Sequence, residues 1–369
     1  MKKILFLIHD LGHGGAEKVL VNLVNNMDPT QFDITVMALF GGGVNEQFLA
    51  SHIRLIVCHR KAIRGNSHIM KLFTPNQLYR YYIKEHYDII ASYLEGPSAR
   101  IVSGCDDPDT KLVCWIHREL KTRRFASASF RNYTEAKQCY QKFHQIICVS
   151  KTVKEDFTGL FPVDKPIDVC YNTNECRYIL DRAQEEIASG IYLPSEINLI
   201  GVGKILGSKG FDRLARIQKR FKDEGYKTHI YVLGEGPQRS EIEKYLTDNN
   251  LVGSYCFLGY QTNPYKFVAK SDLFVCASHA EGFSTAATEA LIVGTPVCTV
   301  EVSGMREMLG DNEYGIITDN DEDALYEGIK DLLDNPEKLA HYKKKAIERG
   351  KRFSTEETVK AVEEMLLSL

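Results

Sequence analysis

Residues 279–297 read HAEGFSTAATEALIVGTPV, and they follow the short apolar run at residues 272–276. A run of this kind, bounded by polar residues, is typical of a buried strand. Ser284 is a good helix cap, the residues after it favour a helix, and Gly294 would end that helix. The segment therefore predicts a strand, a loop and a helix in succession.

The same alternation runs through most of the chain. Strands are expected at residues 4–8, 34–39, 55–58, 88–93, 112–116, 145–149, 198–202, 229–233, 255–258, 273–276, 296–300 and 315–317. The clearest helices are expected at residues 17–27, 211–222, 238–248, 284–293, 322–333 and 337–349. This pattern is typical of an α/β protein in which helices cover both faces of a parallel sheet.

The alternation is interrupted by a polar stretch that ends at Pro194. We therefore expect two Rossmann-like, doubly wound domains, residues 1–172 and 195–353, joined by a linker at 173–194 with one short helix. The last helix, at 354–369, is expected to pack back on the first domain. Two such domains in tandem predict a cleft between them, facing the carboxyl ends of both sheets.

The composition is that of a soluble globular protein, with 26% charged residues and a net charge of -3. Such a chain has no global attraction to nucleic acid, and it contains no nucleic-acid reader motif. The ten cysteines show no C-x-x-C pair and no metal-binding spacing, so we expect reduced thiols and a cytoplasmic location. No secretory signal and no bilayer-spanning stretch is expected.

Two carboxylates flank the expected helix start at Ser284: Glu281 lies before it and Glu289 about one turn into the helix. The free N–H groups at a helix start attract an anion such as a diphosphate. Ionised carboxylates only accept hydrogen bonds, so each Glu could bind hydroxyls on one side of that anion. A diphosphate with a polyol at each end is a nucleotide-sugar. Glutamates are also common at helix starts without a ligand, and on these residues alone both interpretations stay open.

Three glycine-containing loops follow expected strands. The first contains Gly14 and Gly15, the second begins at Gly203, and neither completes the dinucleotide fingerprint of an NAD-dependent enzyme. Lys204 and Lys209 in the second loop could face a phosphate held at the neighbouring helix, although each loop alone is also explained by a tight turn with solvated lysines. The third loop, which could frame a base, consists of Gly234, Glu235, Gly236 and Pro237.

Taken in order, these motifs resemble those of glycosyltransferase family 4, which are retaining enzymes of the GT-B fold. The motifs are G-G-A-E from Gly14, G-K-x-x-x-x-K-G-F from Gly203, G-E-G-P from Gly234 and E-G-F-x-x-x-x-x-E-A-x-x-x-G-x-P-V from Glu281. They extend over nearly the whole chain, and the last motif is the most specific. The pattern is similar to that of bacterial enzymes that build capsule, O-antigen and lipid-linked glycans.

The resemblance implies roles for the charged positions. Glu281 would contact hydroxyls of the donor sugar, and Glu289 would hold the ribose hydroxyls. Lys204 and Lys209 would neutralise the diphosphate. Backbone N–H groups would reach the same diphosphate from Phe283, Ser284 and Thr285.

The resemblance also implies that Gly14 and Gly15 let the N-terminal domain close over the donor. His117, at the end of an expected strand, matches a position near the reacting centre. Two departures stand out: Lys204 replaces a usual Arg, and Ser284 replaces a common Gly, which could alter donor preference. The donor-binding set is completed by Gly203, Gly234, Glu235 and Gly236.

The implied reaction moves a hexose or N-acetylhexosamine from a nucleotide-sugar, by our prediction a UDP-sugar, to a growing polyprenyl-diphosphate-linked glycan. Configuration would be retained. No metal and no cofactor is expected, because two lysines and a helix start would stabilise the leaving group. The D-x-D segments at residues 107–109 and 319–321 are interpreted as surface charges. Two alternatives stay open: a nucleotide-sugar epimerase of the GT-B type, and a non-catalytic nucleotide-sugar or glycan-binding protein.

Two basic stretches lie in the N-terminal half. Residues 118–131 read RELKTRRFASASFR, with Phe125 and Phe130 between the cations. The second stretch contains Arg60, Lys61, Arg64 and Lys71. Both could lie on an anionic membrane surface, where each cation contributes roughly 1 kcal/mol, and this would place the protein on the inner face of the plasma membrane beside a lipid-linked acceptor. Solvated loops and helix faces explain these stretches equally well.

Overall fold

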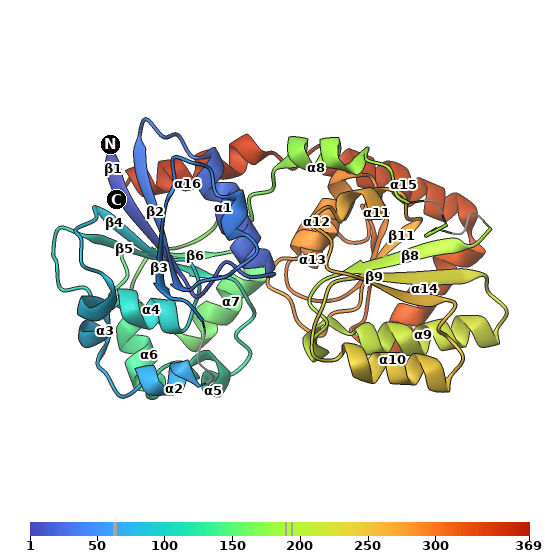
Figure 1. Ribbon diagram of the computed structural model, residues 1–369, viewed down its shortest axis with the longest axis horizontal. Helices are drawn as coiled ribbons and strands as arrows, with labels where there is room; N and C mark the ends of the chain where they lie inside the picture. The colour runs from blue at the N-terminus through green and yellow to red at the C-terminus, as the bar shows by residue number, and fades with distance from the viewer. Residues whose placement is uncertain (62–64, 189, 193–194) are drawn as a thin grey trace. The chain divides into compact units, whose positions relative to one another are not determined.

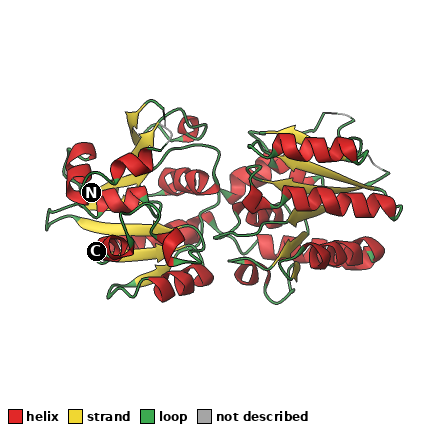
Figure 2. Cartoon of the chain, turned by 90° about the horizontal axis from the view of Figure 1, so that it is seen from below, coloured by secondary structure: helices red, strands yellow, loops and turns green. Residues whose placement is uncertain are grey.

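The computed structural model describes residues 1–61, 65–188, 190–192 and 195–369, which form two compact units (Figure 1). Unit 1 comprises Met1–Thr173 together with Thr355–Leu369, and unit 2 comprises Asn174–Ser354. Each unit contains one parallel sheet with helices on both faces, which confirms the predicted α/β fold class (Figure 2). Arg64 and Pro194 lie outside the described residues.

The sheet of unit 1 has seven strands in the order β3-β2-β1-β4-β5-β6-β7. They are β1 (Lys2–Ile8), β2 (Phe32–Phe40), β3 (Arg54–His59), β4 (Ile89–Ser92), β5 (Lys111–Ile116), β6 (Gln145–Cys148) and β7 (Ile167–Val169). Its helices are α1 (Gly15–Asn26), α2 (Asn66–Met70), α3 (Pro75–Tyr82), α4 (Pro97–Val102), α5 (Arg123–Ala126), α6 (Tyr133–Tyr140), α7 (Lys151–Leu160) and α16 (Thr355–Leu367). The strand order reverses between β1 and β4, and ligands bind at such a switch point.

The sheet of unit 2 has six strands in the order β10-β9-β8-β11-β12-β13. They are β8 (Ile197–Val202), β9 (Thr228–Leu233), β10 (Tyr255–Gly259), β11 (Leu273–Cys276), β12 (Val297–Val300) and β13 (Ile316–Thr318). Its helices are α8 (Cys176–Ala183), α9 (Phe211–Asp223), α10 (Arg239–Asp248), α11 (Tyr265–Ala269), α12 (Thr285–Ile292), α13 (Met305–Leu309), α14 (Glu322–Asp334) and α15 (Pro336–Gly350). Here the order reverses between β8 and β11.

The central strands are apolar along their length because helices shield both faces. Residues 4–8 of β1 are completely buried, as are Ile89 and Ile90 of β4. One strand was not predicted: β7 has three residues, and it lies at the edge of its sheet in parallel with β6. Only its middle residue is exposed, and three residues are too few for a periodic pattern to be recognised.

Helix α8, in the stretch expected to be a linker, is part of unit 2. Its residues Ile179 and Ala183 form a small apolar cluster with Tyr265 of α11 and Ile292 of α12. The segment that follows α8 leads to β8, and Tyr192 there donates a hydrogen bond of 2.7 Å to Phe267 O. Helix α8 and Tyr192 therefore both pack on unit 2, which begins at Asn174.

Helix α16 belongs to unit 1, although the whole of unit 2 precedes it in the sequence. It packs on α1 and buries Val359, Val362 and Leu366. Its Glu363 carboxylate accepts a bond of 2.6 Å from Asp28 N just after α1. In the described ranges, no helix combines the length and apolar character that a bilayer crossing requires.

Candidate active site

Three loops of unit 2 meet at the carboxyl ends of β8, β9 and β11, around the switch point of the sheet. Ile205 N donates to Glu235 O at 2.9 Å, and His279 N donates to Ser208 O at 2.8 Å, so backbone bonds join the loops. This shared edge carries every site residue predicted for unit 2: Gly203, Lys204, Lys209, Gly234, Glu235, Gly236, Glu281, Phe283, Ser284, Thr285 and Glu289.

Glycines allow these loops to touch. A Cβ atom at Gly234 would lie 1.9 Å from Gly203 O, in the loop that follows β8. Gly210 has a φ of +67°, and a Cβ atom there would lie 2.0 Å from Ala277 O. Only glycine fits such contacts without a shift of the backbone. Gly234 and Gly210 therefore allow neighbouring loops to pack directly against one another.

Glu281 and Lys209 form the charged centre of this edge. Lys209 Nζ lies 2.6 Å from Glu281 Oε1, and Ser278 Oγ donates to the same oxygen at 2.6 Å. The Glu281 side chain is 10% exposed, so the pair is largely shielded from water. Burial lowers the pKa of Lys209, but the neighbouring carboxylate outweighs burial and the net shift is upward. Lys209 is therefore charged at neutral pH.

Ser278 was missed from the sequence. It is buried two residues beyond β11, and its hydroxyl fixes one oxygen of the Glu281 carboxylate. A serine directly after an apolar run at a strand end is a signal that could have indicated it, because ligand-facing groups collect at such ends.

Helix α12 begins as predicted at the loop that carries Glu281. Ser284 is the N-cap, and its Oγ accepts a bond of 3.3 Å from Ala287 N. Phe283 before the cap is buried, and so is Glu289, one turn into the helix. The helix start thus points its first N–H groups to the same edge as the charged centre, with Thr285 as its first residue.

The remaining predicted side chains of unit 2 lie in the loops that follow β8 and β9. Lys204 is half-buried just after β8. The Glu235 carboxylate lies 2.6 Å from Arg239, at the start of α10, and Arg239 also binds Glu243. The backbone of Glu235, bonded to Ile205, is therefore the part that shapes the edge.

A second buried network supports the Glu281 loop and was not predicted. Arg213 of α9 is 4% exposed, and its Nη2 lies 2.6 Å from His279 Nδ1. Its Nη1 donates to Asn320 Oδ1 at 3.1 Å. Burial and the Arg213 charge lower the pKa of His279, which keeps this imidazole neutral as an acceptor. An arginine inside an amphipathic helix gives no signal of such a role in a sequence.

In unit 1 the predicted residues lie at the carboxyl ends of β1 and β5. Gly14 is the N-cap of α1 and Gly15 is its first residue. His117 directly follows β5, and its ring lies 4.8 Å from that of buried Tyr93. Within the described chain, His117 Nε2 is a buried nitrogen without a hydrogen-bond partner. Burial lowers the pKa of His117 to about 3, so its imidazole is neutral at physiological pH.

Glu95 holds the backbone at His117 and was also missed. Its Oε2 accepts a bond of 2.9 Å from His117 N, and its Oε1 lies 2.7 Å from Arg118 Nε. The Glu95 side chain is only 8% exposed. A carboxylate after β4 thus fixes the residue that follows β5, across neighbouring strands of one sheet.

The two D-x-D segments are engaged in local structure. Asp107 accepts a bond of 3.0 Å from Asp109 N and lies 2.9 Å from His86 Nδ1. Asp321 caps α14 by accepting a bond of 2.8 Å from Ala324 N. In the part of the chain with described coordinates, no group of three or more His, Cys, Asp or Glu is placed to hold a metal ion.

Sequence comparison places both halves of the chain in one group of enzymes. The family model "Glycosyltransferase Family 4" matches residues 13–173, and "Glycosyl transferases group 1" matches residues 185–349. The chain is 26% identical over 370 residues to the N-acetylgalactosamine-N,N'-diacetylbacillosaminyl-diphospho-undecaprenol 4-alpha-N-acetylgalactosaminyltransferase of Campylobacter jejuni, with 96% of each chain covered. It is 25% identical to the lipopolysaccharide core biosynthesis glycosyltransferase LpsD of Rhizobium meliloti, covering 89% of this chain and 88% of that protein.

Solved structures show the same fold. HepE of Anabaena, in complex with UDP-glucose, matches over the full length of both chains with a TM-score of 0.81 and 18% identity. The sucrose-phosphate synthase of Thermosynechococcus elongatus matches with a TM-score of 0.80 and 16% identity, covering 100% of this chain and 99% of that one. These are two-domain GT-B proteins, as the motif order predicted. With its two α/β units and family matches in both halves, the chain belongs to glycosyltransferase family 4.

Proposed function

We propose that this glycosyltransferase moves a hexose or N-acetylhexosamine from a UDP-sugar to a polyprenyl-diphosphate-linked glycan, with retention of anomeric configuration. The observation that carries the proposal is the Lys209–Glu281–Ser278 cluster beside the start of α12. It places a fixed carboxylate next to a cation and a helix start, which suits a sugar attached to a diphosphate. The Campylobacter relative acts, by its name, on an undecaprenol-diphosphate-linked glycan.

In this proposal the donor diphosphate binds at the N-terminus of α12 with Lys204 alongside. Ser284 Oγ already binds one N–H group, and the groups of Thr285 and Ala286 are directed at the phosphates. Ser278 and Lys209 both bind Oε1 of Glu281. Oε2 then accepts a hydroxyl of the sugar.

Departure of the nucleoside diphosphate builds negative charge on its phosphate oxygens. Lys204, Lys209 and the α12 start stabilise that charge electrostatically, so the proposed reaction uses no metal or other cofactor. A hydrogen-bonding role in transfer is also proposed for His117, because its buried Nε2 has no partner among the described residues. Transfer that proceeds equally with and without a strong chelator is the expected result for this part of the proposal.

The test is the substitution Glu281→Gln, assayed for sugar transfer to a lipid-linked acceptor and for UDP binding. Gln is nearly isosteric but lacks the charge that binds Lys209 and a sugar hydroxyl. We expect transfer to fall roughly ten- to hundredfold, the loss typical of a charged hydrogen bond, while UDP binding persists.

Glu327→Gln, on the exposed face of α14, is the matched control and should transfer at the wild-type rate. The wild-type protein incubated with donor alone completes the design. Conversion of the donor without an acceptor, or transfer unchanged in Glu281→Gln, would overturn the proposal.

A further inference from the structure

An exposed apolar turn at residues 69–73 comprises the end of α2 and the start of its connection to α3 in unit 1. Its side chains Ile69, Leu72 and Phe73 are 51%, 77% and 47% exposed, whereas Met70 is buried. Three large apolar side chains within five residues are unusual on a protein surface and mark a contact site. No role in the transfer reaction accounts for them.

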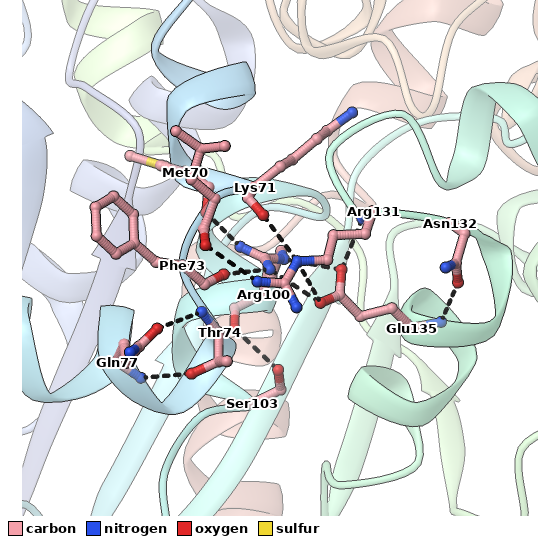
Figure 3. Close-up of polar contacts among 11 residues, drawn as sticks. Met70, Lys71, Phe73, Thr74, Gln77, Arg100, Ser103, Arg131, Asn132 and Glu135 are labelled. Atoms are coloured by element: carbon pink, nitrogen blue, oxygen red, sulfur yellow. Dashed lines mark hydrogen bonds and ion pairs between the residues drawn. The ribbon is translucent and has the colours of Figure 1, made fainter.

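The backbone of this turn has its carbonyl groups bonded by two arginines (Figure 3). Arg100 donates to Met70 O at 2.8 Å and to Phe73 O at 2.7 Å. Arg131 donates to Lys71 O at 2.7 Å and to Leu72 O at 3.2 Å. All the carbonyls from residue 70 to residue 73 are thereby satisfied within the protein.

Satisfied carbonyls matter little for a turn in water, because water can bond to exposed carbonyl groups. They matter in a lipid environment, where an unpaired backbone group is costly and no solvent replaces the missing partner. The turn therefore presents apolar side chains on a backbone that needs no water at these positions.

The charges around the turn are positive. Glu135 is directed inward, where it binds buried Arg100 at 2.9 and 3.0 Å and accepts a bond from Arg131 N at 2.7 Å. Arg123 and Arg124 on α5 are exposed, and α5 also carries the half-exposed Phe125. The hydrogen bonds of Arg131 join the segment that contains α5 to the turn.

Part of the basic segment predicted as a membrane surface does not face outward. Phe130 is 1% exposed and packs at 5.6 Å against the ring of Tyr140, so it belongs to the core. Phe125 is the member of the pair that reaches the surface, with Arg118 4.6 Å from its ring. The apolar part of the surface is supplied instead by the turn at residues 69–73.

We infer that the turn at residues 69–73 inserts into the interfacial region of an anionic phospholipid bilayer, with the cations of α5 on the lipid headgroups. Apolar side chains beside cations match the chemistry of such a surface. A protein partner would not require the carbonyls of residues 70–73 to be satisfied internally. This inference rests on the proposed function, because a lipid-linked acceptor is reached at the membrane.

The experiment is co-sedimentation of the full chain with vesicles of equal parts phosphatidylcholine and phosphatidylglycerol at low salt. The variant Leu72→Ser/Phe73→Ser removes apolar surface without adding charge, and we expect vesicle affinity to fall at least about tenfold. Arg123→Gln/Arg124→Gln should lose about fivefold for each cation. Val252→Ser, an equally exposed apolar site in unit 2, is the control and should bind as the wild type does.

Sugar transfer to a water-soluble acceptor analogue separates the two proposals. Leu72→Ser/Phe73→Ser should retain that activity, with an unchanged melting temperature. Vesicle binding by a wild-type protein that transfers no sugar would refute the proposed function alone. Absence of vesicle binding by the wild type, equal binding by Leu72→Ser/Phe73→Ser, or equal binding to vesicles of phosphatidylcholine only would overturn the membrane inference.

Discussion

His117 combines a fixed backbone with a buried ring nitrogen that has no hydrogen-bond partner among the described residues. Its ring lies against Tyr93, its backbone is held by Glu95, and its Nε2 is buried without a partner among the described residues. Burial lowers its pKa from the ordinary 6.5 to about 3. An unpaired buried nitrogen costs stability, and such costs are common at functional sites.

We expect His117→Phe, which keeps a ring beside Tyr93 but has no Nε2, to lower sugar transfer at least roughly tenfold.

The wild-type folded state resists protonation of His117 below pH 6.5, whereas the unfolded state binds the proton. The stability that neutral His117 contributes is therefore fully present above pH 6.5, and it is lost as the pH falls toward 3. The melting temperature of the variant should fall less between pH 7 and pH 5. Equal turnover in both proteins would assign His117 a structural role.

Individual site residues could be predicted from the sequence only where they belong to a recognisable motif. Glu281, Lys209 and Ser284 belong to motifs with fixed spacing, and the structure brings all three to one edge. Ser278 binds Glu281 within its own loop, whereas Glu95 contacts His117 from the loop of a neighbouring strand. Both residue types are common everywhere on a surface, and the position of Glu95 also depends on the packing of β4 beside β5.

At the scale of elements, the clamp formed by Arg100 joins α4 to α6 and to the turn before α3. Arg100 is 1% exposed, and it pairs with Glu135 while it also donates to two backbone carbonyls. Removal of one member of a buried pair leaves the other charge and its acceptors uncompensated.

Arg100→Met should therefore lower the free energy of unfolding by about 3 to 5 kcal/mol, as measured by urea denaturation. Arg131→Met is the matched control, since Arg131 is largely exposed and its loss should cost about 1 kcal/mol or less. Equal effects of the two substitutions would show that the clamp does not depend on burial.

The strands and long helices were predictable because their periodicity is strong, and most observed bounds differ from the expected ones by one or two residues. Most exceptions are short, although α3, α6 and α7, which have eight to ten residues, were not assigned either. β7 has three residues, and α2, α5, α11 and α13 have five or fewer, so that a single turn provides no repeat. The turn at residues 69–73 depends on two arginines that lie 27 or more positions away in the sequence.

For the molecule as a whole, α16 is the element that makes unit 1 discontinuous in sequence. A chain that stops after residue 354 would expose the face of α1 that Val359 and Val362 cover, and it would lose the bond between Glu363 and Asp28. Hydrogen exchange measured by mass spectrometry should then accelerate in α1. Exchange in β8 and β11 of unit 2 should not change, and uniform acceleration in both units would contradict this assignment.

The position of α16 also has a consequence for synthesis on the ribosome. Every residue of unit 2 leaves the exit tunnel before residues 355–369 do, so unit 2 can finish folding while α1 still lacks the helix that packs on it. The uncovered face of α1 is then open to chaperones throughout the elongation of the second half. Emergence of residues 355–369, rather than emergence of the first half, is the event that allows unit 1 to close.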